Sequence, residues 1–312
     1  MTRHRLRTVF LVGVLIAWIT SPSVIADPTF VGPKVCSQCH KAEEDVWYHS
    51  KHQMSYAKLH KRSLSKKLTA AIGGPKSAKK NPACVACHYS LIARAGRKRA
   101  RPRAGPSCES CHGAGSEWLD IHHRLGRFRH SAEEPTDTRR NRLSRSAKAG
   151  MIHSDMRFEL ANTCMRCHGL ARADLAFELQ AKLMAAGHPV DREFEVVRYS
   201  QGSIRHRFYP PDFRNNKSLN DKQLAEWLVI GAAAQLVAAH AAQAGSSDQG
   251  YRNLQRARAD AASAILRELS LPEAKALLTQ PSQANARRLT DRLEGADLSA
   301  LARRLPSKTT YR

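Results

Sequence analysis

The chain has 312 residues, and its 51 lysines and arginines outweigh 27 aspartates and glutamates to give a formal net charge of +24. This length is enough for one large or two modest domains, and the positive field favours an acidic protein partner, an anionic membrane surface or an anionic substrate. The sequence contains no nucleotide-binding, hydrolase or protease motif, which excludes those classes as leading interpretations.

The first 26 residues are predicted to be a secretory signal peptide. Arg3, Arg5 and Arg7 form a basic start, an apolar run covers 8–20, and Ala26 offers a small residue for cleavage. An uncleaved anchor is the alternative, but the run is shorter than the ~20 residues of a spanning helix. We therefore expect the mature chain to begin at Asp27 in a bacterial periplasm, where nucleic acid is an improbable partner.

All eight cysteines lie in four copies of the pentapeptide C-x-x-C-H, the attachment motif of c-type haem. In this motif the two thiols bind the haem vinyl groups as thioethers and the histidine ligates the iron. Zinc ribbons and thiol redox motifs also use C-x-x-C, but neither requires the histidine that follows every copy. The sequence predicts four covalently bound haems, with iron held at Cys36-Ser-Gln-Cys39-His40, Cys84-Val-Ala-Cys87-His88, Cys108-Glu-Ser-Cys111-His112 and Cys164-Met-Arg-Cys167-His168.

Residues 27–214 are predicted to form the haem domain, with short helices at the motifs and little regular sheet. Leu175, Leu179 and Leu183 recur at helical spacing and predict a helix over 173–186. One stretch is unusually basic and indicates either a solvated flexible loop or a docking patch. Its cations are Arg94, Arg97, Lys98, Arg99, Arg101 and Arg103.

Residues 215–312 lack cysteine and are predicted to form a helical extension. Helices are expected over 218–244, 249–269 and 282–293, and a further helix is expected to begin with a capping box at Ser270 and a proline at 272. The apolar stretch 228–239 is rich in alanine, which favours close helix packing over a membrane span. The expected fold class is mainly α, a multihaem cytochrome c fold with a haem stack as its core and a C-terminal helical hairpin or bundle.

The second axial ligand of each iron decides whether a haem only passes electrons or also binds small molecules. Ten histidines remain after the motifs and His4 are set aside, more than four irons need. They are His49, His52, His60, His122, His123, His130, His153, His188, His206 and His240.

The chain resembles the tetrahaem cytochrome c-554 family, electron carriers for hydroxylamine oxidation in nitrifying bacteria. The resemblance covers roughly residues 30 to 200. It is carried by the first motif with Trp47 and His52 after it, by the third motif with Gly113, Gly115 and His122 after it, and, more weakly, by Met184-Ala-Ala-Gly187-His188-Pro189.

The resemblance implies a ligand map in which His122 faces His40, His188 faces His112 and His52 faces His168. It leaves His88 without a partner and its iron open. His49 competes with His52, and His123 lies beside His122. The C-terminal extension departs from the short family members and could supply a ligand from His206 or His240.

Two functions follow from these expectations. The first is an electron-transfer cytochrome that exchanges electrons with an acidic redox protein or a membrane-associated quinol or oxidoreductase system. The second is an oxidoreductase for a small nitrogen species (nitrite, nitric oxide or hydroxylamine) at the haem of His88. The sequence shows no recognisable constellation of proton donors for such catalysis, which favours electron transfer.

Overall fold

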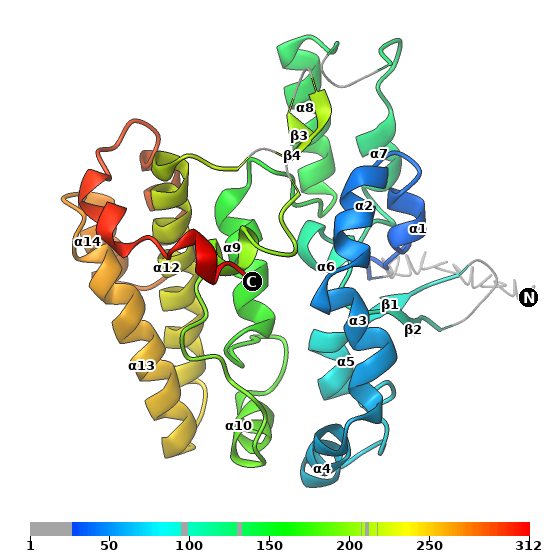
Figure 1. Ribbon diagram of the computed structural model, residues 1–312, viewed down its shortest axis with the longest axis vertical. Coiled ribbons are helices and arrows are strands. Elements are labelled where there is room, and N and C mark those ends of the chain that lie inside the picture. Colours follow the sequence, from blue (N-terminus) through cyan, green and yellow to red (C-terminus); the bar gives the residue numbers. More distant parts are fainter. Residues whose placement is uncertain (1–26, 95–98, 130–132, 207, 210–211, 217) are drawn as a thin grey trace, which may run out of the picture.

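The computed structural model describes residues 27–94, 99–129, 133–206, 208–209, 212–216 and 218–312. Helices dominate, which confirms the expected mainly α class (Figure 1). The described strands form two antiparallel hairpins, β1 (Ser90–Ile92) with β2 (Arg101–Ala104) and β3 (Phe208–Tyr209) with β4 (Asp212–Asn216). The predicted signal peptide lies outside the described residues.

The motif-bearing part of the chain is a series of short helices joined by turns. In chain order these are α1 (Pro33–Cys36), α2 (Lys41–Tyr48), α3 (Lys51–Lys58), η1 (Leu59–Lys61), α4 (Ser63–Ile72), α5 (Pro82–His88), α6 (Cys108–His112), α7 (Leu119–His123), α8 (Thr136–Lys148), α9 (Arg157–Cys167), α10 (Phe177–Ala185) and α11 (Val196–Ser200).

Local sequence explains where two of the motif helices begin. Asn81 caps α5 by accepting a hydrogen bond from the backbone of Ala83, and Pro82 occupies the first helical position. Ser107 and Ser110 form a reciprocal capping box at the start of α6. Each cap fixes a helix whose last residue is a motif histidine.

The basic segment between the second and third motifs is partly a hairpin. Ser90 pairs with Ala104 and Ile92 with Arg101, so the arginines of β2 stand on a strand, where a flexible loop had been one expectation. The Ser90 hydroxyl donates to the Gly105 carbonyl at 2.8 Å and closes the base of the hairpin. Of the six predicted cluster residues, Arg97 and Lys98 lie outside the described part.

The C-terminal extension is helical, as expected from its periodicity. Its elements are α12 (Asp221–Ala244), α13 (Gln249–Leu266), α14 (Pro272–Thr279), α15 (Gln283–Arg292), η2 (Ser299–Arg304) and η3 (Lys308–Thr310). One detail of the prediction is wrong: Leu271, not Ser270, is the N-cap of α14, and it makes no side-chain capping bond. Proline at the first helical position sets the start there without a polar cap.

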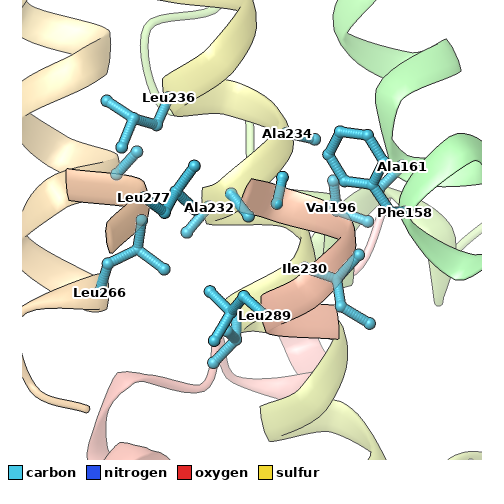
Figure 2. Packing of buried hydrophobic residues seen from close by; sticks show 14 of the residues in the cluster. Phe158, Ala161, Val196, Ile230, Ala232, Ala234, Leu236, Leu266, Leu277 and Leu289 are labelled. Carbon is cyan, nitrogen blue, oxygen red and sulfur yellow. The ribbon is translucent and has the colours of Figure 1, made fainter. Parts of the chain in front are cut away.

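The extension packs onto the motif-bearing part through α9. Phe158 and Ala161 of α9 face Ile230 and Ala234 of α12, and side chains of α13, α14 and α15 close the cluster from the other side (Figure 2). Small alanines on α12 allow this close approach. The largest hydrophobic cluster thus includes residues from both sides of position 214, and the domain boundary there stays a prediction.

Helix α12 is long and apolar enough to cross a membrane, as judged by length and composition alone. However, 83% of its apolar window is buried inside the protein. Its buried residues include Val229, Ile230 and Leu236 of the cluster shared with α9 and α13, and others belong to two smaller clusters. It is therefore a core helix in this fold, consistent with the expectation from its alanines.

Candidate functional site: four facing histidine pairs

Each motif histidine has a second histidine ring facing it from a distant part of the chain. The distances between ring centres fall in a narrow range. They are 6.1 Å for His40 and His122, 6.1 Å for His52 and His168, 5.9 Å for His88 and His188, and 6.3 Å for His112 and His206.

This spacing fits one iron between two axial imidazoles. A metal ion binds an imidazole nitrogen at about 2 Å, so two imidazoles on opposite sides of one iron have ring centres roughly 6 Å apart. Aromatic rings in direct contact have centres about 4.5–7 Å apart, a range that includes these distances. The stronger observation is that each of the four pairs includes the histidine of an attachment motif, at a separation into which one iron would fit.

Hydrogen bonds at Nδ1 orient several of these rings so that Nε2 is left for a metal. Because a carbonyl only accepts, Nδ1 is the donor in three of these bonds, and in a fourth it faces a carboxylate. The partners of Nδ1 are Ile152 O for His112 at 2.8 Å, Pro189 O for His188 at 2.9 Å, Ile204 O for His206 at 2.7 Å and Glu43 Oε1 for His40 at 3.4 Å.

Burial keeps most of these imidazoles neutral. It lowers the pKa of His88, His122 and His168 to about 4, with repulsion from neighbouring histidines adding to the effect. Burial also lowers the pKa of His52 and His188. A neutral imidazole is the form that binds metal, so these rings are ready to act as ligands at neutral pH.

Two of the facing histidines lie on helices that follow the first and third motifs closely in the sequence. His52 lies in the first turn of α3. Ser50 is the N-cap of this helix, and its hydroxyl accepts a hydrogen bond from the Gln53 backbone at 3.4 Å. His122 lies in α7, and Arg142 of α8 donates to its carbonyl at 2.6 Å.

The other two facing histidines come from turns that later parts of the chain position. His188 follows α10 and comes directly after Gly187, whose φ of +94° is the left-handed conformation that favours glycine. His206 lies between α11 and β3, where Asn216 of β4 donates to the neighbouring Arg205 carbonyl at 2.6 Å. Both positions depend on contacts between distant segments.

The pairing differs from the expected ligand map at two irons. His188 faces His88 instead of His112, and His206 faces His112. Helix α10 packs against α4, and the turn after α10 brings His188 to His88. The expected open side at His88 is therefore covered by His188. The pairings expected for His40 and His168 agree with the structure.

The competing histidines lie elsewhere. His49 and His123 are exposed, and the structure turns His52 and His122 toward the motif histidines in their place. His240 is exposed on α12. His153 is half-buried and lies 3.8 Å from an Asp155 carboxylate oxygen. His130 lies outside the described residues.

The motifs follow one another in space in the order first, third, fourth, second. The Cys36 thiol interacts with Cys108, and this interaction lowers the pKa of Cys36. Helix α6 of the third motif contacts α9 of the fourth. The fourth and second motifs meet where the Cys87 and Cys167 thiols interact, which raises the pKa of Cys87.

Two side chains connect neighbouring motifs. The Glu109 carboxylate, 2% exposed, accepts hydrogen bonds from the backbones of Val31 and Gly32 at 2.8 and 2.7 Å and ties the third motif to the entry of the first. Arg172 donates to the Ala86 carbonyl at 2.7 Å and ties the fourth motif to the second. Sequence reasoning did not single out either residue.

The zinc alternative finds no support in the described part of the chain. No three histidine, cysteine or acidic side chains converge there in an arrangement that could hold a metal ion. A zinc ribbon needs four such ligands around one ion.

Comparison with known proteins also indicates a c-type cytochrome. The family model described as cytochrome c554 and c-prime matches residues 35–113, which include the first three motifs. Cytochrome c-554 of Nitrosomonas europaea is 31% identical over 165 residues, and the match covers 51% of this chain and 66% of that protein. No solved structure matches the chain. The chain belongs to the cytochrome c-554 family of c-type cytochromes, which carry covalently bound haem.

Proposed function

We propose that the protein is a periplasmic electron carrier with four covalently attached haems, each with a histidine on both sides of its iron. The observation that carries this proposal is the set of four facing histidine pairs at 5.9–6.3 Å. Haem, when bound, supplies an iron that cycles between the ferric and ferrous states. The paired histidines would hold that iron from both sides, which would leave the redox change as the available chemistry.

The structure favours this function over small-molecule reduction. A nitrogen-species oxidoreductase needs an open iron, and the expected position for one was at His88. His188 occupies that side, and its Nδ1 bond to the Pro189 carbonyl holds it there. A cavity of about 610 Å³ lies between α7 and α8, but none of the paired histidines lines it.

The order of the motifs supports conduction along the protein. The attachment sites form a chain of neighbours that begins at the first motif, passes the third and fourth, and ends at the second. Electrons would therefore pass between the haems of neighbouring motifs, which suits a carrier between two partners.

The charge distribution supports an acidic redox partner that docks near the second motif. Residues 46–108, which include that motif, contain no aspartate or glutamate. We call this segment the acid-free lobe. In the described part of the chain, none of the exposed lysines and arginines of this segment forms an ion pair with a carboxylate. These residues are Lys51, Lys58, Lys61, Arg62, Lys66, Lys67, Lys76, Lys80, Arg94, Arg99 and Arg101. Such a surface steers an acidic protein to this end of the series.

A reductive titration tests the proposed function. The anaerobic protein should take up four electrons per chain and return them to an oxidant. It should show no steady-state turnover with nitrite, hydroxylamine or nitric oxide when a reduced dye supplies electrons. Sustained turnover with any of the three would instead establish an enzyme.

A further inference from the structure

Helix α13 carries three buried polar side chains on one face, and all three are directed at the backbone of the fourth motif. Tyr251, Gln255 and Arg258 are 0%, 0% and 2% exposed, and their spacing of four and three residues puts them on the same side of the helix. Polar groups of this size are rarely buried so completely without a specific partner. We refer to them as the α13 strip.

The strip hydrogen-bonds three consecutive carbonyls that begin at the motif histidine. Arg258 Nη2 donates to His168 O at 3.2 Å, and Arg258 Nη1 and Gln255 Nε2 donate to Gly169 O at 3.2 and 2.8 Å. The Tyr251 hydroxyl donates to Leu170 O. A segment of the C-terminal extension therefore holds the backbone on which a predicted iron ligand stands.

The backbone at this point is shaped to receive the guanidinium. Gly169 has φ of +99°, and Leu170, a residue with a side chain, has φ of +51°. A Cβ atom on Gly169 would lie 2.0 Å from Arg258 Cζ, so only glycine leaves the space that the guanidinium fills. Left-handed backbone at a leucine persists where surrounding contacts determine it, and the α13 strip provides those contacts.

The Arg258 charge is not neutralised by any described residue. Its hydrogen-bond partners are the two carbonyls, the Gln255 side-chain oxygen at 2.9 Å and Met165 Sδ at 3.6 Å, all uncharged. Among the described residues, no carboxylate lies within ion-pair distance. A guanidinium keeps its proton at neutral pH, so the side chain carries a full positive charge. An unpaired buried charge is costly, which calls for a functional reason.

We propose that Arg258 raises the reduction potential of the iron held at the fourth motif, and that the C-terminal extension serves to deliver this charge. Reduction removes one positive charge from the iron centre, and a nearby fixed positive charge disfavours the more positive ferric state. The effect is strong where little water screens it. This proposal rests on the proposed haem at Cys164, Cys167 and His168, but not on the identity of any partner.

The test compares three variants by redox titration, monitored by the low-spin spectra of the individual haems. Arg258→Met keeps the side-chain stem and removes the charge, so one of four midpoint potentials should fall while the other three stay in place. Arg258→Lys keeps a charge and should retain most of the wild-type value. Gln255→Met removes the neutral hydrogen bonds to the Gly169 carbonyl and to Arg258 but no charge, so that potential should change much less than in Arg258→Met.

A purely structural role would give a different pattern. If Arg258→Met and Gln255→Met lower the same potential equally, the charge is not responsible and the proposal is overturned. The same holds if that potential falls as far in Arg258→Lys as in Arg258→Met. It is also overturned if no potential moves. Haem content and far-ultraviolet circular dichroism verify folding, and Arg258→Gln, which keeps a donor for Gly169, replaces the methionine variant if that chain does not fold. A wild-type protein without four haems would instead refute the proposed function.

Discussion

At the scale of single residues, the account depends on which histidine faces which. His188 is the decisive one, because its position separates an electron carrier from a protein with an open iron. Its Nδ1 donates to the Pro189 carbonyl, and the ring centre lies 5.9 Å from that of His88. The ring is therefore held in place by its own turn and not only by a metal.

Replacing His188 with alanine should open one iron. We expect one haem to become high-spin in the ferric state and the reduced variant to bind about one carbon monoxide per chain, because one axial position is vacated. His240→Ala is the matched control, since His240 is exposed and faces no motif histidine. Optical titration with carbon monoxide measures the binding. If neither variant binds carbon monoxide, His188 is not an iron ligand.

The sequence could predict some of these pairs and not others, for a physical reason. His52 and His122 lie on helices that follow the first and third motifs closely, and recognisable neighbours such as Trp47 mark their positions. The position of His188 depends on the packing of α10 against α4. The position of His206 depends on the path of the chain between α11 and β3. Motif spacing carries no record of that packing, so the ring pairs at His88 and His112 differ from the map that the resemblance implies.

At the scale of elements, the interface between α9 and α12 joins the extension to the motif-bearing part. Helix α9 carries both cysteines of the fourth motif near its end, and it supplies Phe158 and Ala161 to the hydrophobic cluster (Figure 2). The periodicity of the sequence predicted the helices of the extension well, because each buries an apolar stripe. It could not predict the α13 strip, because buried polar residues interrupt that pattern.

Truncating Phe158 to alanine should destabilise the protein by about 3–5 kcal/mol, because the ring is 1% exposed and its loss leaves a cavity between α9 and α12. Leu91→Ala is the control: Leu91 is 42% exposed on β1, and its truncation should change stability by about 0.5 kcal/mol or less. Guanidinium unfolding followed by circular dichroism gives both values. Similar midpoints for the two variants would argue against the α9–α12 core.

At the scale of the whole molecule, charge is distributed unevenly. The acid-free lobe occupies the end of the structure that contains α3, α4, α5 and the β1–β2 hairpin, whereas exposed arginines of the extension pair with acidic neighbours such as Glu268 (Figure 1). Composition alone indicated a basic protein with an anionic partner. It did not indicate where that partner would dock, because the position of the lobe relative to the motif series is a property of the fold.

Charge reversal on the lobe should slow electron exchange with an acidic redox protein. Lys66→Glu combined with Lys67→Glu on α4 should lower the second-order rate constant by roughly tenfold or more at low ionic strength, and the difference should shrink as salt is added. Arg267→Glu combined with Lys275→Glu makes the same change in net charge at exposed positions of the extension. Stopped-flow measurements that show equal slowing in both double variants would point to net charge and not to the lobe.

The mature protein should begin at Asp27 and carry four covalent haems. Its intact mass should equal that of residues 27–312 plus four haems, and the haems should remain attached after acid denaturation because thioether bonds are covalent. Mass spectrometry of the protein from the periplasmic fraction measures both features. Two haems, or stoichiometric zinc, would contradict the assignment of the four motifs.

The central claim is that all four irons have two histidine ligands, and the spin state of the ferric protein tests it most directly. Electron paramagnetic resonance of the fully oxidised wild-type protein, with spins counted against the haem content, separates six-coordinate bis-histidine iron from five-coordinate iron. Four low-spin haems and no high-spin signal are expected. A high-spin component of one haem per chain would contradict it and would restore the open iron at the second motif.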